Sequence, residues 1–264
     1  MTPGSPDTPR HRRHGPAVVT LDDICQGVRS LGIGAGDTVM VHSSLSAFGW
    51  VEGGADTVID ALLYVLGTSG TLVMPTFTWQ EHHARERVEF DVQHTPCETG
   101  RIPEIFRTRR GVIRSVHVCH SVAAAGPAAG QVMSEGSSSF GPGSSFDALL
   151  QLDAWILMLG VSFQACTALH AVEEFVGVPY RKHRHYRGSV VILPDGRRLP
   201  SRSIEYLRQD GSGNDFAKMA GFFREAGVLR ETRIGQTRCM AVRMADIFAV
   251  TRPLLAQNPR FLSR

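Results

Sequence analysis

The sequence has few cysteines, and none of them belongs to a C-x-x-C motif. Five cysteines, odd in number and widely scattered, argue against both a disulfide framework and a structural zinc site. No stretch approaches the roughly 20 continuous apolar residues that a membrane helix needs. The formal net charge of +3 is too small for a dedicated nucleic-acid binder. We therefore expect a cytoplasmic protein, monomeric or homodimeric, with no nucleic-acid partner and no membrane partner.

The first 17 residues are basic and rich in proline and glycine, but they lack the apolar core of a signal peptide. We expect 1–17 to be a disordered basic tail. The remainder, with 42% apolar and 20% charged residues over the whole chain, has ordinary globular composition. We therefore assign 18–264 to a single compact domain.

Short apolar runs alternate with helical patterns along this domain. The runs 39–41, 71–74 and 155–159 are typical of buried strands. Helical spacing or capping residues predict helices at 20–32, 56–67, around 170, 215–226 and 244–250. Pro194-Asp195-Gly196 predicts a hairpin within 187–206, whereas the polar segments 80–92 and 134–145 are expected to be loops. The order predicts an α/β fold: a mixed central sheet with flanking helices and a C-terminal portion of β-hairpin and helices.

The segment 165–174 carries the clearest catalytic pattern. Thr167, His170 and Glu173 are spaced i, i+3 and i+6, so a helix would place them on one face. A carboxylate beside an imidazole stabilises its charged form and fixes the tautomer, which leaves the other nitrogen free to accept a proton. A general base needs this arrangement. A histidine and a glutamate that merely face solvent would show the same spacing, so the pattern alone leaves both interpretations open.

A serine-rich segment, VHSSLSAFG at 41–49, directly follows the first predicted strand. Consecutive serines after a buried strand offer hydroxyl and backbone N–H groups to a phosphate or a thioester oxygen. Serine-rich turns also occur without any ligand.

Three further clusters allow other chemistry. His117 and His120 could join His170 in the zinc site of a hydrolase, but eleven histidines make chance pairs common and H-E-x-x-H is absent, so we predict no metal. Cys166 could be a thiolate nucleophile beside His170, although it follows an apolar run and we expect it to be buried. The basic run 180–187 predicts a solvated loop that could reach the phosphates of a nucleotide cofactor.

Taken in order, five stretches resemble the aminoglycoside 3-N-acetyltransferase family, antibiotic acetyltransferases distinct from the GNAT fold. The matching stretches lie at 41–79, 90–107, 114–129, 140–150 and 157–174, and include HSSLS, R-S-x-H and T-x-x-H-x-x-E elements. The resemblance implies antibiotic resistance by direct acetyl transfer from acetyl-CoA to the 3-amino group of an aminoglycoside.

The resemblance also implies roles for individual residues. Catalysis would fall to His170, Glu173 and Thr167. Cofactor binding would involve His42, Ser43, Ser44, Leu45, Ser46, Gly49, Pro75, Thr76, Arg114, Ser115 and Ser121. On the acceptor side we expect Glu174, Glu205 and Asp210.

The chain departs from the family pattern at two places. Val118 stands where the family usually has proline, and the basic run 180–187 would repel a cationic drug if it lined the acceptor pocket. The alternatives are therefore an acyl-CoA-dependent N-acyltransferase for a different, biosynthetic amine, a metal-dependent hydrolase, and a noncatalytic binding protein with the same fold.

Overall fold

The computed structural model describes residues 18–78, 85, 87–133 and 137–264. The tail predicted at 1–17 lies outside the described residues, as do parts of the loops predicted at 80–92 and 134–145. No helix in the described ranges is long and apolar enough to cross a bilayer.

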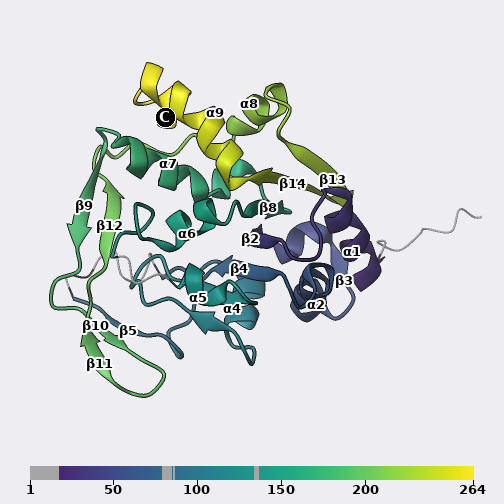
Figure 1. Ribbon diagram of the computed structural model, residues 1–264, viewed down its shortest axis with the longest axis horizontal. Helices are drawn as coiled ribbons and strands as arrows, with labels where there is room; N and C mark the ends of the chain where they lie inside the picture. Colours follow the sequence, from purple (N-terminus) through teal and green to yellow (C-terminus); the bar gives the residue numbers. More distant parts are fainter. Residues whose placement is uncertain (1–17, 79–84, 86, 134–136) are drawn as a thin grey trace, which may run out of the picture.

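The fold is built on a mixed sheet in which seven strands run in the order β13-β14-β8-β2-β4-β7-β6 (Figure 1). At its centre β2 pairs in parallel with both β4 and β8, whereas the outer pairs are antiparallel. The strands are β2 (Thr38–Ser43), β4 (Thr71–Pro75), β6 (Ile113–Arg114), β7 (Val122–Ala125), β8 (Trp155–Leu159), β13 (Arg230–Ile234) and β14 (Thr237–Arg243). The predicted mixed α/β sheet is confirmed.

The central strands are apolar at successive positions because both faces of the sheet are covered. Val39 and Val41 of β2 pack into one apolar cluster, and Met40 between them packs into the cluster on the other face. The first cluster joins the sheet to α1 (Leu21–Ser30), α2 (Gly54–Leu66) and α4 (Arg101–Arg107). The second joins it to α5 (Ala129–Val132), α6 (Ser145–Gln151), α7 (Ala168–Val176), α8 (Met219–Glu225) and α9 (Met244–Gln257).

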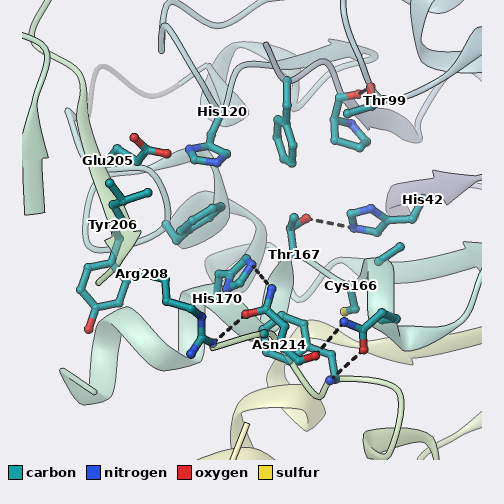
Figure 2. A pocket seen from close by; sticks show the side chains of 18 of the residues that line it. His42, Thr99, His120, Cys166, Thr167, His170, Glu205, Tyr206, Arg208 and Asn214 are labelled. Carbon is teal, nitrogen blue, oxygen red and sulfur yellow. Dashed lines mark hydrogen bonds between the residues drawn. The ribbon is translucent and has the colours of Figure 1, made fainter. Parts of the chain in front are cut away.

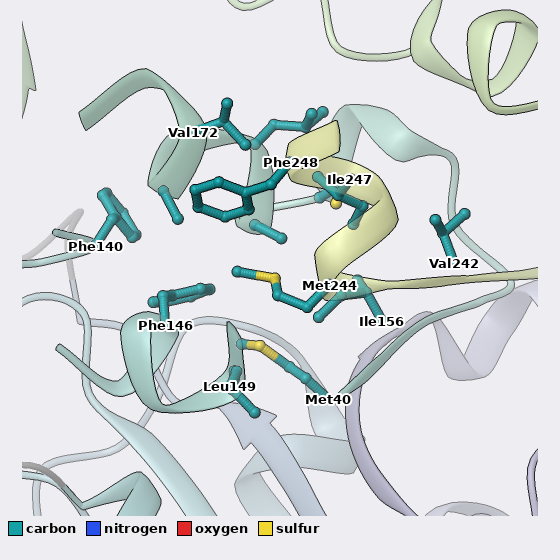
Figure 3. Packing of buried hydrophobic residues seen from close by; sticks show 14 of the residues in the cluster. Met40, Phe140, Phe146, Leu149, Ile156, Val172, Val242, Met244, Ile247 and Phe248 are labelled. Atoms are coloured by element: carbon teal, nitrogen blue, oxygen red, sulfur yellow. The ribbon is translucent and has the colours of Figure 1, made fainter. Parts of the chain in front are cut away.

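The second cluster fixes the position of α7, the helix that carries His170. Figure 3 shows Val172 of α7 beside Phe248 and Ile247 of α9, with Phe146 of α6 below them. These side chains are fully or almost fully buried, so their packing fixes the rotation of α7 about its axis. The direction in which His170 points is fixed with it.

Smaller β elements extend one side of the molecule. One three-stranded sheet consists of β5 (Glu89–Asp91), β10 (Val190–Ile192) and β11 (Arg198–Pro200), and β9 (Arg181–His185) pairs with β12 (Ile204–Arg208). Where the structure describes the chain, the remaining elements are the paired strands β1 (Val18–Val19) and β3 (Trp50–Val51) and the 3-10 helices η1 (Leu45–Phe48) and η2 (Phe163–Ala165). The predicted hairpin around 194–196 is confirmed, because β10 and β11 pair antiparallel across it.

Four predictions are wrong: two segments expected to be loops contain strands, and two helices have other ends than expected. The basic run is the strand β9 rather than a loop, because it pairs with β12 beyond the β10–β11 hairpin, and residues 89–91 form β5, because they pair with β10 about a hundred positions further along. The helix predicted at 215–226 begins only at Met219, and the last helix continues from Met244 to Gln257.

Candidate active site

His42 and Ser43 lie at the carboxyl end of β2, beside the end of β8. Directly after β8 the chain turns at Gly160, which has a φ of +77°. A Cβ there would lie 2.9 Å from the Cβ of Ala47 and 3.2 Å from the carbonyl oxygen of Ser44. Glycine therefore allows this turn to approach the serine segment closely. Ligands of open α/β sheets bind at such strand ends.

A cavity of about 520 Å³ opens at this junction. In Figure 2, His170 and Asn214 lie close together, Thr167 lies beside His42, and Glu205 lies on the other side of the view from His42. The cavity is thus bordered by titratable and hydrogen-bonding groups from α7, β2, β12 and the loop after β12.

His170 is held by the carboxylate one helical turn further along α7. Its Nδ1 lies 2.6 Å from Oε2 of Glu173, and the rings of Phe140 and Phe216 pack against it with centroids 5.2 and 4.7 Å away. Burial, together with the positive charge of Arg181, lowers the pKa of His170 to about 4, although Glu173 favours the charged form. The imidazole is therefore neutral near pH 7. Its Nδ1–H donates to Glu173, which leaves the Nε2 lone pair available.

Glu173 is completely buried, with 0% of its side chain exposed. Tyr180 donates its hydroxyl hydrogen to Oε1 at 2.6 Å, and Nε of Arg181 lies 2.8 Å from Oε2. Burial alone would raise the pKa of Glu173, but the contacts with His170, Arg181 and Tyr180 outweigh it, so the pKa falls. An ionised carboxylate thus faces Nδ1 of the imidazole. The contact predicted from the i, i+3 spacing is present, and the catalytic role of the pair stays a prediction.

Arg181 reaches this site because the basic run is a strand. Along β9, Arg181 and Arg184 are half-buried, whereas Lys182, His183 and His185 are exposed. Reading the run as a solvated loop missed Arg181. The run is a strand because 181–185 pair regularly with 204–208, and composition alone does not reveal this pairing.

Asn214 is a second residue that the sequence did not indicate. Its Oδ1 accepts hydrogen bonds from Nη2 of Arg181 at 2.8 Å and from Nη2 of Arg208 at 2.7 Å, and its Nδ2 lies 3.5 Å from Nε2 of His170. No sequence motif identifies a functional asparagine in this loop. Asn214 is 44 positions from His170 in the sequence, and only the tertiary fold places the two side chains together.

Thr167 lines the first cavity together with His170, and its φ and ψ are helical. It is the residue just before α7, and its side chain makes no capping hydrogen bond. Its Oγ1 instead lies 3.2 Å from Nε2 of His42, at the edge of the cavity (Figure 2). Burial lowers the pKa of His42 to about 4, so this neighbour is also a neutral imidazole near pH 7.

The serine segment borders a second cavity of about 800 Å³. Ser43 lines both cavities, and Ser44, Leu45, Ser46 and Gly49 line the second. Within the described residues, the buried Oγ of Ser43 has no hydrogen-bond partner. Ser43 thus marks the point where the two cavities meet, and the structure brings together five of the predicted cofactor residues around it.

The remaining predicted cofactor residues lie mostly behind the cavity wall. Pro75 lines the first cavity, but Thr76 and Ser121 hydrogen-bond to each other inside the protein. Nε of Arg114 donates to the hydroxyl oxygens of both, at 3.1 Å each, and Ser115 Oγ accepts from the backbone N–H of Val122. Thr76, Arg114, Ser115 and Ser121 line neither cavity, so the structure does not place them at the surface that a cofactor would contact.

Of the three carboxylates predicted on the acceptor side, Glu205 lines the first cavity, and it accepts a hydrogen bond from the Tyr186 hydroxyl at 2.9 Å. Glu174 and Asp210 do not line the cavity. The cavity contains a second carboxylate, Glu98, that the sequence did not single out. Glu174 pairs with His183, Ser138 and the N–H of Phe140, and Asp210 pairs with Arg208, Arg260 and Ser212.

The alternative nucleophile and the alternative metal ligands are both placed by the structure. Cys166 is buried, and burial raises the pKa of its thiol to about 12, as expected for an apolar position. The rings of His117 and His120 lie 5.6 Å apart, with His120 at the cavity. In the part of the chain that the structure describes, no three His, Cys, Asp or Glu side chains converge as a metal site would require.

Comparison with known proteins places this site in a family. A family model described as aminoglycoside 3-N-acetyltransferase matches residues 40–256. Aminoglycoside N(3)-acetyltransferase VII of Streptomyces paromomycinus is 33% identical over 219 residues, which cover 76% of this chain and 75% of that protein.

Solved structures of related enzymes share the fold. A variant of aminoglycoside acetyltransferase AAC(3)-IVa with one histidine replaced by alanine, in complex with a gentamicin, superposes with a TM-score of 0.80 at 28% identity, over 95% of this chain and 93% of that one. A binary complex of AAC-IIIb with CoASH has a TM-score of 0.77 at 24% identity, over 91% and 97% of the two chains. Acetyl-CoA is the donor used by this family. The chain is an aminoglycoside N-acetyltransferase-like enzyme and belongs to the aminoglycoside 3-N-acetyltransferase family.

Proposed function

We propose that this enzyme transfers an acetyl group from acetyl-CoA to the 3-amino group of an aminoglycoside, with His170 as the general base. The observation that carries the proposal is the state of His170. Its neutral ring donates Nδ1–H to an ionised, fully buried Glu173, which leaves Nε2 as the proton acceptor at the cavity. The family membership supports the reaction class, and the geometry supports His170 as the base.

The donor is expected to occupy the second cavity and to end at Ser43. Two features of this chain fit a long phosphorylated thioester there: a cavity of about 800 Å³ bordered by serine hydroxyls, and a buried Ser43 Oγ with no partner among the described residues. Acetyl-CoA would supply the acetyl group as an activated thioester. Pro75, at the first cavity, would border its reactive end.

The proton chemistry follows from these positions. His170 accepts the proton of the acceptor nitrogen through Nε2 as the N–C bond forms and the C–S bond breaks, and the sulfur leaves with the bonding electrons as the CoA thiolate. Glu173 stabilises the imidazolium that this step creates. Thr167 supplies a hydroxyl hydrogen toward the oxygen or sulfur on which negative charge develops. Holding both substrates at one junction adds the advantage of proximity.

The acceptor side of the cavity provides Glu98 and Glu205 as partners for the ammonium groups of an aminoglycoside. Arg181 and Arg208 also line this cavity. Their presence favours, as a second candidate, an acyl-CoA-dependent N-acyltransferase whose acceptor is a less cationic amine. A cytoplasmic location is part of either proposal, because all five cysteines are free thiols, as a reducing compartment requires.

The decisive experiment is an assay of thiol release from acetyl-CoA with a panel of acceptors, run on the wild type and on His170→Ala. The panel contains gentamicin-type aminoglycosides and singly charged primary amines. Turnover with aminoglycosides, acetylated at the 3-amino group and lost in His170→Ala, is the expected result. Turnover confined to singly charged amines would select the second candidate. Full activity of His170→Ala would overturn the assignment of the base.

A matched binding measurement separates loss of chemistry from loss of the fold. We expect CoA to raise the melting temperature of the wild type and of His170→Ala by similar amounts, because His170 lies in the first cavity and the serine segment borders the second. Activity that disappears with a chelator and returns with zinc would instead support the metal-dependent hydrolase.

A further inference from the structure

A single arginine lies against groups on both sides of the His170 ring. Nε of Arg181 is 2.8 Å from Oε2 of Glu173, the oxygen that also receives Nδ1–H of His170. Nη2 of the same guanidinium donates to Oδ1 of Asn214 at 2.8 Å, and Nη1 donates to the carbonyl oxygen of Tyr206 at 3.2 Å. Nε makes no well-aligned hydrogen bond among the described residues, so Arg181 holds Glu173 as an ion pair, whereas its Nη2 orients Asn214 by a hydrogen bond.

The orientation of the Asn214 amide follows from its arginine partners. Nη2 of Arg208 donates to the same Oδ1 at 2.7 Å, so two N–H groups point at this atom. Only an oxygen can accept both, which places Nδ2–H₂ on the other side, 3.5 Å from Nε2 of His170. A hydrogen on Nε2 would then face another donor. At 3.5 Å the contact is weak, so it disfavours that tautomer without blocking the lone pair.

We propose that Arg181 and Asn214 are positioning residues that hold His170 as its Nδ1–H tautomer, with Nε2 kept free for the proton of the acceptor amine. The proposal rests on the proposed role of His170 as base. Neither residue takes the proton itself. Arg181 fixes the buried carboxylate that receives Nδ1–H, and Asn214 presents a donor where the wrong tautomer would need an acceptor.

The electrostatic surroundings support the same assignment. Besides Glu173 on α7, the titratable and charged side chains nearest to the His170–Glu173 pair are Tyr180 just before β9, Arg181 on β9 and Arg208 on β12. The same cavity is also lined by His42, His120, Cys166, Glu98 and Glu205. Arg181 and Arg208 disfavour the imidazolium, whereas Glu173 favours it. Phe140 and Phe216 cover the ring and limit its contact with water. Removing one arginine charge should therefore make the ring easier to protonate.

Two substitutions of Arg181 separate its charge from its shape. Arg181→Gln removes the charge, so the midpoint of His170 titration should rise by about one pH unit. Arg181→Lys keeps the charge but has one flexible ammonium that cannot reach Glu173 and Asn214 together. For the lysine variant we expect a nearly unchanged midpoint, a mixture of tautomers and a kcat lower by roughly 100-fold.

Asn214→Asp tests the other side of the ring. It places a carboxylate oxygen where an amide hydrogen faced Nε2, which favours a proton on that nitrogen. We expect a larger upward shift of the midpoint than in Arg181→Gln. The matched control is Lys182→Gln, which removes a positive charge from the next position of β9, where the side chain is exposed. It should change neither the tautomer nor the titration.

The measurement is ¹⁵N NMR of the histidine side chains in the substrate-free enzyme across pH, with the His170 signal assigned from its loss in His170→Ala. The acid limb of kcat/KM for each variant should move with the NMR midpoint. Lower activity in Arg181→Gln and Asn214→Asp with unchanged tautomer and midpoint would overturn the proposal.

Two outcomes keep this proposal distinct from the proposed function. If Arg181→Gln does not fold, Asn214→Asp decides the question, because its side chain has nearly the same volume as the original. The tautomer could shift as expected in these variants while His170→Ala remains fully active. That result would support Arg181 and Asn214 as the residues that fix the tautomer, and would overturn the role of His170 as base.

Discussion

The two cavities differ in how much of their chemistry the protein completes by itself. At the first, the His170 ring is bound by Glu173, and Glu173 in turn by Tyr180 and Arg181. At the second, Ser44 and Ser46 hydrogen-bond only weakly to each other at 3.3 Å, and the buried Oγ of Ser43, where the two cavities meet, has no partner among the described residues.

This difference indicates a division of labour. Groups that move a proton must be oriented before the substrate arrives, because a catalytic group oriented beforehand needs no reorganisation during the reaction. Groups that bind a phosphorylated carrier gain their hydrogen bonds from the ligand itself. Substitutions at the first cavity should therefore lower kcat, and substitutions at the second should raise KM.

Glu173→Gln gives the strongest test of the first cavity. The amide can donate to Nδ1 and so favour the wrong tautomer of His170, and it also leaves Arg181 without its ionised partner. We expect kcat to fall by roughly 10³- to 10⁴-fold with little change in KM for acetyl-CoA. Steady-state kinetics and the melting-temperature shift with CoA measure the two effects. A large rise in KM with an unchanged kcat would contradict the division between the cavities.

Whether the sequence could predict a contact in this site depends on how far apart the two residues are in the sequence. Glu173 is three residues from His170 on one helix, so spacing predicted their contact. Strands β2, β4 and β8 were predicted because burial on both faces produces continuous apolar runs. Asn214 was not predicted, because its place depends on the pairing of β9 with β12 and on side chains distant in sequence. The role of the basic run was missed for the same reason.

Acid should destabilise the histidine-rich side of the junction. Burial lowers the pKa values of His42, His117 and His170 to about 4, so between pH 6.5 and 4 the unfolded chain binds more protons than the folded one. Folding stability is then lost as pH falls through this window, by at most about 1.4 kcal/mol per pH unit for each histidine. Urea unfolding at a series of pH values measures the slope.

The slope can be assigned with a pair of variants. His42→Gln should reduce it, because one buried imidazole is removed, whereas His185→Gln at an exposed position of β9 should leave it unchanged. An equal slope in both variants would show that the buried histidines do not cause the acid sensitivity.

Gly49→Ala gives a milder test of the second cavity. Gly49 ends η1 with φ +83° and ψ −120°, a conformation that a residue with a Cβ adopts only under strain. The serine segment should shift, so we expect KM for acetyl-CoA to rise roughly tenfold, about 1.4 kcal/mol, with little change in kcat. Gly32→Ala is the matched control: its φ is also +83°, no atom lies within 4 Å of the added Cβ, and it lines neither cavity. Equal changes in KM would mean that general strain, rather than the serine segment, is responsible.

The smallest effect is expected for Cys166→Ala, which tests whether the first cavity uses a second route through a thiolate. The thiol borders the cavity, but burial raises its pKa to about 12, so it is almost entirely protonated at pH 7. Loss of one buried sulfur should cost about 1 kcal/mol of stability and change kcat less than threefold. Kinetics and alkylation by iodoacetamide provide the measurement. Inactivation by iodoacetamide at pH 7 that the alanine variant resists would contradict direct transfer. A fully active alanine variant would leave His170, with its buried carboxylate, as the group on which the chemistry of this cavity depends.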